Sequence, residues 1–370
     1  MEFTVGMQEL VKELSLTQGV VERKTTIPIL SNILLEAEDG LLTLTATDLE
    51  LSIQTSCPAS VTREGSGTVP AKKLLDLVRL LPDGEIRFKL LENHWVQIVS
   101  GRRTYKIVGL SKENFPALPE LPPMLVKIPS KLLADVIAKT TFAISTEESR
   151  YTLNGALAIL KPEAITMVAT DGHRLAIIET DYRFEGLPGE VRTLVPKKAL
   201  NEITRLAADA GEDSEFEFAQ DESHLFFRIG PHLLVSRKLT GQFPNFEAVL
   251  PRDNNKTVAL DRNELQNALR RVSQLSDQRS HAVKLTLASE GIELSASSPD
   301  YGEAKEAIER EYKGDPIAIG FNADYLLDFL AATAEGPISL ELKDEQSAGQ
   351  LRPQGDPATR YRYVVMPMRI

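Results

Sequence analysis

The residues of this chain that could carry out acid–base chemistry gather in one short stretch, Thr170–Arg174, which reads Thr-Asp-Gly-His-Arg. A carboxylate near a histidine is the pairing that general base catalysis uses. The histidines, however, show no spacing typical of zinc ligands, and the single cysteine, Cys57, has no histidine beside it. Phosphate-binding loops and nucleophile elbows are also missing. We therefore expect no catalytic residue, no metal site and no cofactor, and interpret Asp171 and His173 as turn residues. A hydrolase or transferase that uses both is the alternative.

Two apolar segments flank this stretch, Met167–Ala169 before it and Leu175–Ile178 after it, which indicates a strand, a tight turn and a second strand. The same pattern surrounds Asp48, and a looser version surrounds Asp300. The three aspartates are 123 and 129 positions apart (171 − 48 and 300 − 171). A period near one third of the chain predicts one structural unit repeated three times.

Other landmarks follow the same period. Each copy opens with a strand and an amphipathic helix, and a second helix begins near Pro70, Pro196 and Asn322. Two proline-containing segments, Phe115–Pro123 and Phe243–Asn255, are unsuited to a helix or a central strand and mark boundaries. The sequence thus predicts an α+β protein of three repeated domains, each with two helices backed by antiparallel sheets. The domains cover residues 1–122, 123–252 and 253–370.

The composition is typical of a globular protein in a reducing compartment. Apolar residues make up 42% of the chain and charged residues 26%, and one cysteine cannot form an internal disulfide. No segment approaches the roughly 18 consecutive apolar residues that span a bilayer, and no secretory signal is apparent. We expect a cytoplasmic protein without a membrane partner. Its net charge of −11 argues against a protein that coats nucleic acid through bulk attraction.

The second helices of the first two copies carry a repeated charged face. A lysine is followed by an acidic residue four positions later and an arginine seven positions later, spacings that place all three on one side of a helix. An exposed face with an internal salt bridge is the ordinary interpretation. The residues are Lys72, Asp76 and Arg79 in the first copy, Lys198, Glu202 and Arg205 in the second, and Asp324, Asp328 and Ala331 in the third.

Over its full length the chain resembles the bacterial β sliding clamps, the processivity subunits of the replicative DNA polymerase. The most specific matches are Ala169–Ala176 and Tyr363–Ile370, and Val69–Lys73 and Arg150–Gly155 add to them. The resemblance implies a non-catalytic clamp that encircles duplex DNA and tethers the polymerase and other DNA-processing proteins. It also implies a head-to-tail homodimer, a ring of six domains with helices lining the hole and sheets outside.

The resemblance and the repeat together indicate which residues face DNA. Lys24, Lys72 and Tyr151 match DNA-facing positions of the family, and the repeat adds Lys198 and Arg205. These side chains should touch phosphates and not base edges, so binding to double-stranded DNA should be independent of sequence.

Two further sets of residues concern protein partners. By resemblance, the strand around Tyr105 and Ile107 should meet the region of Gln274 and Leu275 in a second copy and close the ring. A pocket between the second and third domains should take short peptides of the polymerase, the clamp loader and other clamp-binding proteins. Methionine gives such a pocket a pliable apolar surface. Its residues are Leu153, Thr170, Gly172, His173, Arg174, Leu175, Pro244, Val249, Val364, Met366, Pro367, Met368 and Arg369.

The size of the domains independently favours a dimeric ring. A domain of about 125 residues has a diameter of roughly 35 Å if it is treated as a sphere. Three such spheres in a ring leave a hole of about 5 Å, whereas six leave about 35 Å. B-DNA is about 20 Å across. One chain therefore cannot encircle a duplex, but two can. A monomeric scaffold that binds peptides and has no role on DNA is the second alternative.

Overall fold

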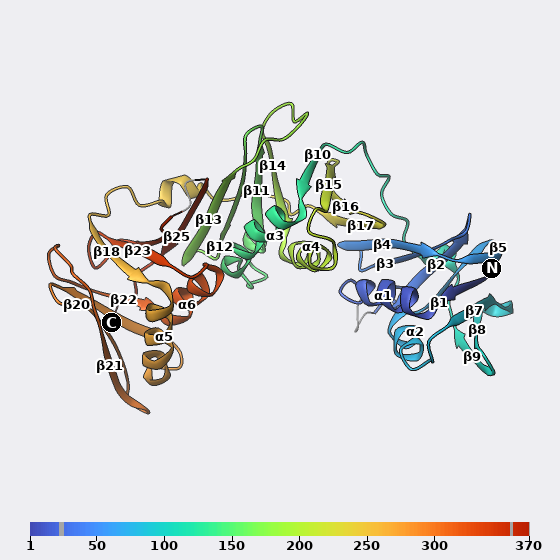
Figure 1. Cartoon of the computed structure of the whole chain (residues 1–370), viewed down its shortest axis with the longest axis horizontal. Coiled ribbons are helices and arrows are strands. Elements are labelled where there is room, and N and C mark those ends of the chain that lie inside the picture. The colour runs from blue at the N-terminus through green and yellow to red at the C-terminus, as the bar shows by residue number, and fades with distance from the viewer. Residues whose placement is uncertain (22–25, 356–357, 370) are drawn as a thin grey trace. The chain divides into compact units, whose positions relative to one another are not determined.

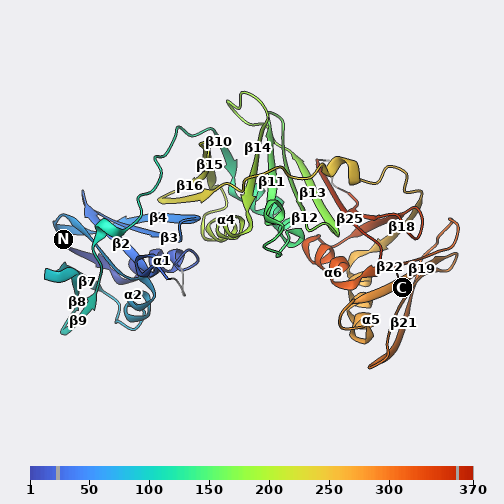
Figure 2. The same cartoon turned by 180° about the vertical axis from the view of Figure 1, so that it is seen from behind.

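The structure, a computed structural model, describes residues 1–21, 26–355 and 358–369. The chain divides into two compact units, each formed from two stretches of sequence. Unit 1 contains Met1–Lys131 and Lys198–Lys238, and unit 2 contains Leu132–Lys197 and Leu239–Ile370. Figures 1 and 2 show the elements of both units from opposite sides. The division passes through the middle of the predicted second domain.

Unit 1 is built on two antiparallel sheets. Its strands are β1 (Glu2–Gly6), β2 (Asn32–Glu38), β3 (Leu41–Thr47), β4 (Leu51–Pro58), β5 (Ser60–Arg63), β6 (Gly65–Pro70), β7 (Glu85–Leu90), β8 (Trp95–Ser100), β9 (Arg103–Val108), β10 (Val126–Pro129), β15 (Glu215–Gln220), β16 (His224–Ile229) and β17 (His232–Arg237). Its helices are α1 (Met7–Thr17), α2 (Ala71–Val78) and α4 (Lys197–Asp209), of which α1 packs on β3 and β4. The strand orders are β5-β1-β7-β8-β9 and β10-β15-β16-β17-β4-β3-β2-β6.

Unit 2 also has two antiparallel sheets. Its strands are β11 (Gly155–Lys161), β12 (Ala164–Thr170), β13 (Arg174–Asp181), β14 (Val191–Pro196), β18 (Lys256–Asp261), β19 (Ala282–Ala288), β20 (Gly291–Ser298), β21 (Gly302–Glu309), β22 (Ile317–Asn322), β23 (Pro337–Leu342), β24 (Gly349–Pro353) and β25 (Thr359–Val365). Its helices are α3 (Ser130–Ala138), α5 (Arg262–Val272) and α6 (Ala323–Ala332), of which α5 packs on β20 and β21. The strand orders are β14-β11-β12-β13-β25-β24-β23-β18 and β21-β20-β19-β22.

The second helix of each repeat begins where its sequence signal predicts. Pro70 and Pro196 are the last residues of β6 and β14, directly before α2 and α4. Asn322 caps α6, since its side-chain oxygen accepts hydrogen bonds from the N–H groups of Asp324 at 2.8 Å and Tyr325 at 3.4 Å. The α+β class, with a first and a second α-helix in each repeat, is confirmed in the described residues.

The two largest sheets run across the boundaries between repeats. Strand β17 of the second repeat pairs with β4 of the first, with Leu233 opposite Gln54. Strand β25 of the third repeat pairs with β13 of the second, with Val364 opposite Leu175. By position in the repeat, β4, β13 and β21 are equivalent strands, and so are β9, β17 and β25. This joining explains why the compact units do not coincide with the predicted domains.

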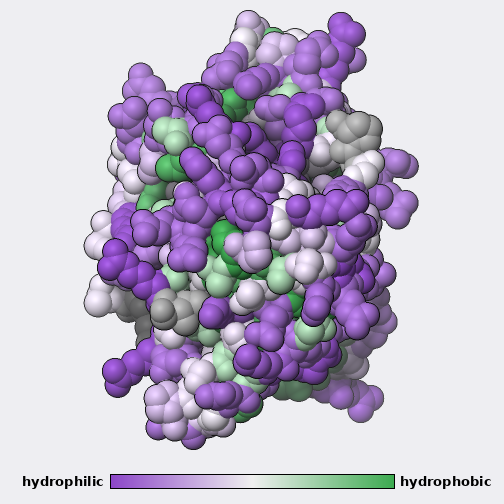
Figure 3. Space-filling view, turned by 90° about the vertical axis from the view of Figure 1, so that its left-hand side faces the viewer, coloured by the Kyte–Doolittle hydropathy of each residue, from purple (hydrophilic) through white to green (hydrophobic). Residues whose placement is uncertain are grey.

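The sequence analysis expects no segment that spans a membrane. None of the helices within the described ranges is long and apolar enough to cross a membrane. Figure 3 views the molecule from the side that is on the left in Figure 1, where β20 and β21 lie, and most of that surface is hydrophilic with small, separate hydrophobic areas.

Candidate functional site

The turn between β12 and β13 is held by its own side chains. Asp171 Oδ1 accepts hydrogen bonds from the backbone N–H groups of His173 at 2.9 Å and Arg174 at 3.0 Å, and its Oδ2 accepts one from Arg174 Nε at 3.0 Å. Gly172 has a φ of +89°, which favours glycine, and donates its N–H to Thr170 Oγ1. Both oxygens of the Asp171 carboxylate are thus occupied by the turn and do not orient the His173 ring for catalysis.

Other groups that could do chemistry are equally poorly placed for it. Burial, together with the nearby carboxylates of Glu13 and Glu9, raises the pKa of the Cys57 thiol to about 12. A thiol of this kind is not a nucleophile at neutral pH. Across the residues that the structure describes, no group of three or more His, Cys, Asp or Glu residues is arranged to hold a metal ion.

One face of the sheet formed by β14, β11, β12 and β13 is apolar in the second repeat but not in the third. Strand register identifies the equivalent positions, because the pair Leu157–Leu194 corresponds to the pair Lys284–Gly320. The third repeat folds with polar residues or glycine at these positions, so the fold does not require the apolar ones. The second repeat has Leu157, Ile159, Val168, Leu175, Ile177 and Leu194 where the third has Lys284, Thr286, Ser295, Glu303, Lys305 and Gly320.

This apolar face is only partly covered. The segment after β17 packs Phe243 and Phe246 against it, and β25 contributes Val364. Beside it, Val249 and Met366 leave 54% and 48% of their surfaces exposed. Large exposed apolar side chains at the margin of an apolar cluster are typical of a binding surface.

The chain after β25, Met366–Arg369, is called the tail here, and it joins the turn to the edge of the four-stranded sheet. Met366 donates its N–H to the His173 carbonyl at 2.9 Å, and Met368 donates its N–H to the Gly320 carbonyl at 2.8 Å.

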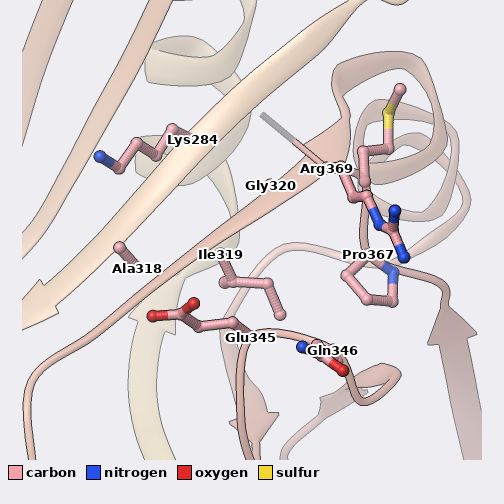
Figure 4. A pocket seen from close by; sticks show the side chains of 9 residues that line it. Lys284, Ala318, Ile319, Gly320, Glu345, Gln346, Pro367 and Arg369 are labelled. Carbon is pink, nitrogen blue, oxygen red and sulfur yellow. The ribbon is translucent and has the colours of Figure 1, made fainter.

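A cavity of about 940 Å³ lies beside the tail (Figure 4). Sequence reasoning did not find the side of the cavity opposite the tail, where Ala318–Gly320 of β22 lie, because this short piece of an edge strand carries no motif. The lining residues are Lys284, Ala318, Ile319, Gly320, Glu345, Gln346, Pro367, Met368 and Arg369.

The residues predicted to form a peptide pocket come from a few neighbouring segments of unit 2. Leu175 and Val364 lie opposite each other in the sheet, and both belong to the apolar cluster. Leu153 is buried in the short 3₁₀ turn Tyr151–Leu153 that precedes β11. The other predicted residues lie in the β12–β13 turn, the segment after β17 and the tail. They are Thr170, Gly172, His173, Arg174, Pro244, Val249, Met366, Pro367, Met368 and Arg369.

Arg174 points into the protein, with only 10% of its side chain exposed. Its Nη1 pairs with Asp328 Oδ2 of α6 at 2.6 Å, and its Nη2 donates to the Phe142 carbonyl at 2.7 Å. The guanidinium carbon lies 4.3 Å from the centre of the Tyr325 ring. Burial opposes the charge, but Tyr363 and Asp328 outweigh it and raise the pKa of Arg174 above its ordinary value. Arg174 therefore stays charged.

The residues expected to face DNA have different surroundings. Lys24 lies outside the described residues. Lys72 is exposed on α2, and Tyr151 is 47% exposed. Lys198 is half exposed and forms an ion pair with Asp48 in the turn before β4. Lys72, Tyr151 and Lys198 are therefore accessible from solvent in the chain by itself.

Arg205 is engaged within unit 1. Its Nη1 donates to the Ser15 carbonyl at 3.1 Å, and its Nη2 donates to the Leu16 carbonyl and pairs with Glu202. Glu202 is only 8% exposed, and burial raises its pKa although Arg205 opposes this. The expectation of an exposed charged face is wrong for Glu202, because the chain around Gly19, just after α1, lies against its carboxylate.

The residues predicted to close a ring lie at strands β9 and β21, each of which ends a sheet. Tyr105 and Ile107 are on β9, opposite Ile98 and Val96 of β8. Gln274 and Leu275 are in the 3₁₀ turn Ser273–Leu275, which contacts β20 and β21.

Comparison with known proteins gives one consistent result along the whole chain. Models of the DNA polymerase III beta subunit match its N-terminal domain at residues 1–119, its central domain at 127–245 and its C-terminal domain at 247–369. The beta sliding clamp of Pseudomonas aeruginosa is 34% identical over 374 residues, and that of Caulobacter vibrioides is 36% identical over 378, each covering all of both chains. The crystal structure of the Pseudomonas aeruginosa DNA polymerase III subunit beta superimposes with a TM-score of 0.93 and 34% identity over all of both chains.

Proposed function

The chain belongs to the DNA polymerase III beta subunit family, the beta sliding clamps, and we propose that two copies close into a ring around duplex DNA. It is a DNA sliding clamp that makes the polymerase processive, and it is not an enzyme. DNA, the polymerase and a second copy of the chain are its partners. We propose that it acts in the cytoplasm.

The observation that carries the ring is the rule by which the repeats join. The β4–β17 and β13–β25 pairs each unite one member of the first set of equivalent strands with one of the second. Among the described strands, only β21 and β9 lack this partner, and each ends its sheet. An exposed edge of this kind is a template for another strand. Pairing β21 of one copy with β9 of the other forms the same joint twice in a closed two-fold ring.

The repeat also supplies an ion pair for this joint. Within the chain, Lys198 of α4 pairs with Asp48 in the turn before β4. Lys72 of α2 is equivalent to Lys198 (198 − 126), and Asp300 before β21 is equivalent to Asp48 (48 + 252). Both Lys72 and Asp300 are exposed in the single chain. We expect Lys72 of one copy to meet Asp300 of the other, and an ammonium has further donors for a phosphate.

Retention by a closed ring removes the conflict between DNA binding and a net charge of −11. A ring needs only weak, sequence-independent contacts, and the exposed Lys72, Lys198 and Tyr151 can supply them at phosphates. The charge of the remaining surface discourages adhesion to nucleic acid from outside.

The apolar face of the second repeat is the proposed docking site for the polymerase, the clamp loader and other proteins with a clamp-binding peptide. Leu175 and Val364 form its floor, and Val249 and Met366 are exposed beside it. A short extended peptide can place apolar side chains there, and methionine adapts to different ones.

Retention on DNA of defined topology tests the ring. Protein loaded onto nicked circular DNA should remain bound, and it should leave when the circle is cut once. Equal retention on linear DNA would contradict a topological link. Sedimentation as a monomer at micromolar concentration would instead favour the monomeric peptide-binding scaffold.

Charge reversal tests the joint itself. Lys72→Asp should weaken the dimer about tenfold or more, since it replaces an attraction at each of two interfaces by a repulsion. Adding Asp300→Lys to the same chain should restore the dimer, whereas Lys343→Asp, which changes a lysine paired with Asp253 instead, should not affect it. A double variant that stays monomeric would refute the proposed ion pair.

A further inference from the structure

The side chain of Arg174 connects three elements around the proposed peptide pocket. Arg174 starts β13, directly after the turn that contains His173. Its guanidinium also reaches Asp328 on α6 and the carbonyl of Phe142 in a short 3₁₀ turn. The guanidinium therefore connects the second repeat to the second helix of the third repeat.

The same geometry makes Arg174 a poor ligand for a peptide. A guanidinium offers five N–H donors in one plane. All three of its nitrogens are engaged, by Asp171, by Asp328 and by the Phe142 carbonyl. The Tyr325 ring lies over the group, and solvent reaches only 10% of the side chain. Three of the five donors are therefore already used, and the burial of the side chain leaves a peptide little access to the other two.

We infer that Arg174 is a positioning residue, which holds the β12–β13 turn against α6 and thereby sets the place of the His173 carbonyl. That carbonyl accepts the N–H of Met366, so the tail is fastened to the same turn. One guanidinium thus fixes the spacing between two walls of the pocket, the turn and the tail. The inference rests on the proposed function, because it assumes that this pocket takes peptides.

Asp328→Asn distinguishes positioning from direct contact, because the two roles predict opposite signs. An Arg174 that binds peptide would be freed by this change, and affinity would stay the same or rise. A positioning Arg174 would lose its anchor on α6, and we expect peptide binding to weaken about five- to thirtyfold, which lies within the range for coupled residues of one network. Asp328 is 44% exposed, so the variant should fold.

Two matched variants serve as controls. Asp324→Asn removes a carboxylate one turn earlier on α6 that pairs with His281 and not with Arg174, so affinity should not change. Asp328→Glu keeps the charge and should restore most of the affinity. Arg174→Lys keeps its own charge but loses the planar fork, and should weaken binding as much as Asp328→Asn.

The measurement is the fluorescence anisotropy of a labelled clamp-binding peptide of the polymerase, with thermal unfolding recorded for each variant. Weaker binding by Asp328→Asn at a melting temperature within about 2 °C of the unaltered protein supports positioning, because a purely structural role would move the melting temperature first. Unchanged or tighter binding by Asp328→Asn, while the unaltered protein binds normally, would overturn the positioning role alone. No binding by the unaltered protein would overturn the proposed pocket and this role together.

Discussion

Deleting Met366–Ile370 should abolish peptide binding and leave a folded dimer. The deletion removes two backbone hydrogen bonds, from Met366 to His173 and from Met368 to Gly320. Each contributes about 1 kcal/mol net. Met366 is 48% exposed, so little further burial is lost with it. The free energy of unfolding should fall by about 2 kcal/mol, which lowers the melting temperature by roughly 4–8 °C.

The loss of affinity should be much larger than the loss of stability. Burying a methionine side chain against a ligand contributes about 1.5–3 kcal/mol, so removing Met366 and Met368 together should weaken the peptide complex at least about a hundredfold. Fluorescence anisotropy measures the affinity, sedimentation the dimer, and calorimetry the melting temperature. A truncated protein that still binds the peptide would refute the pocket, and so would one that unfolds outright.

Three further outcomes are expected. Leu275→Asp should yield monomers in sedimentation at micromolar concentration, because it places an unpaired charge at an apolar contact; a persistent dimer would contradict the interface. Lys198→Gln should reduce the slope of log affinity against log salt by about one without creating sequence preference, and a large preference would contradict phosphate contact. Burial alone would raise the pKa of Glu179, but Thr166 and Arg360 outweigh it and lower that pKa below 4.5. The stability from Glu179 is therefore present above pH 4.5 and is lost as the pH falls below it, so Glu179→Gln should flatten the dependence of urea unfolding on pH in that range.

Local signals in the sequence were sufficient to predict the turn and the helices. The Asp171 carboxylate accepts hydrogen bonds from two backbone N–H groups within three residues of itself, and Gly172 supplies the positive φ. Asn322 likewise caps α6 with its own side chain. Such contacts span a few residues, so residue types and spacing determine them.

Long-range contacts could not be predicted in the same way. The burial of Glu202 depends on the chain around Gly19, just after α1. Arg205 likewise bonds to carbonyl groups of α1 that precede it by almost two hundred residues. The inward orientation of Arg174 depends on Asp328 in the next repeat. Helical spacing gives the face on which a side chain lies, but not what later packs against that face.

The comparison of repeats separates what folding requires from what binding adds. Leu157 and Leu175 occupy positions where the third repeat has Lys284 and Glu303, although the four equivalent strands follow one another in the same order in both sheets. An apolar surface left partly open favours unwanted association, so its presence in the second repeat and its absence from the third are best explained by a partner that covers it. Each chain then offers one such face and a dimeric ring two, which limits the ring to two peptide-bound partners at a time. Titration with labelled peptide should accordingly saturate at one peptide per chain, and a higher ratio would show that a second repeat also binds.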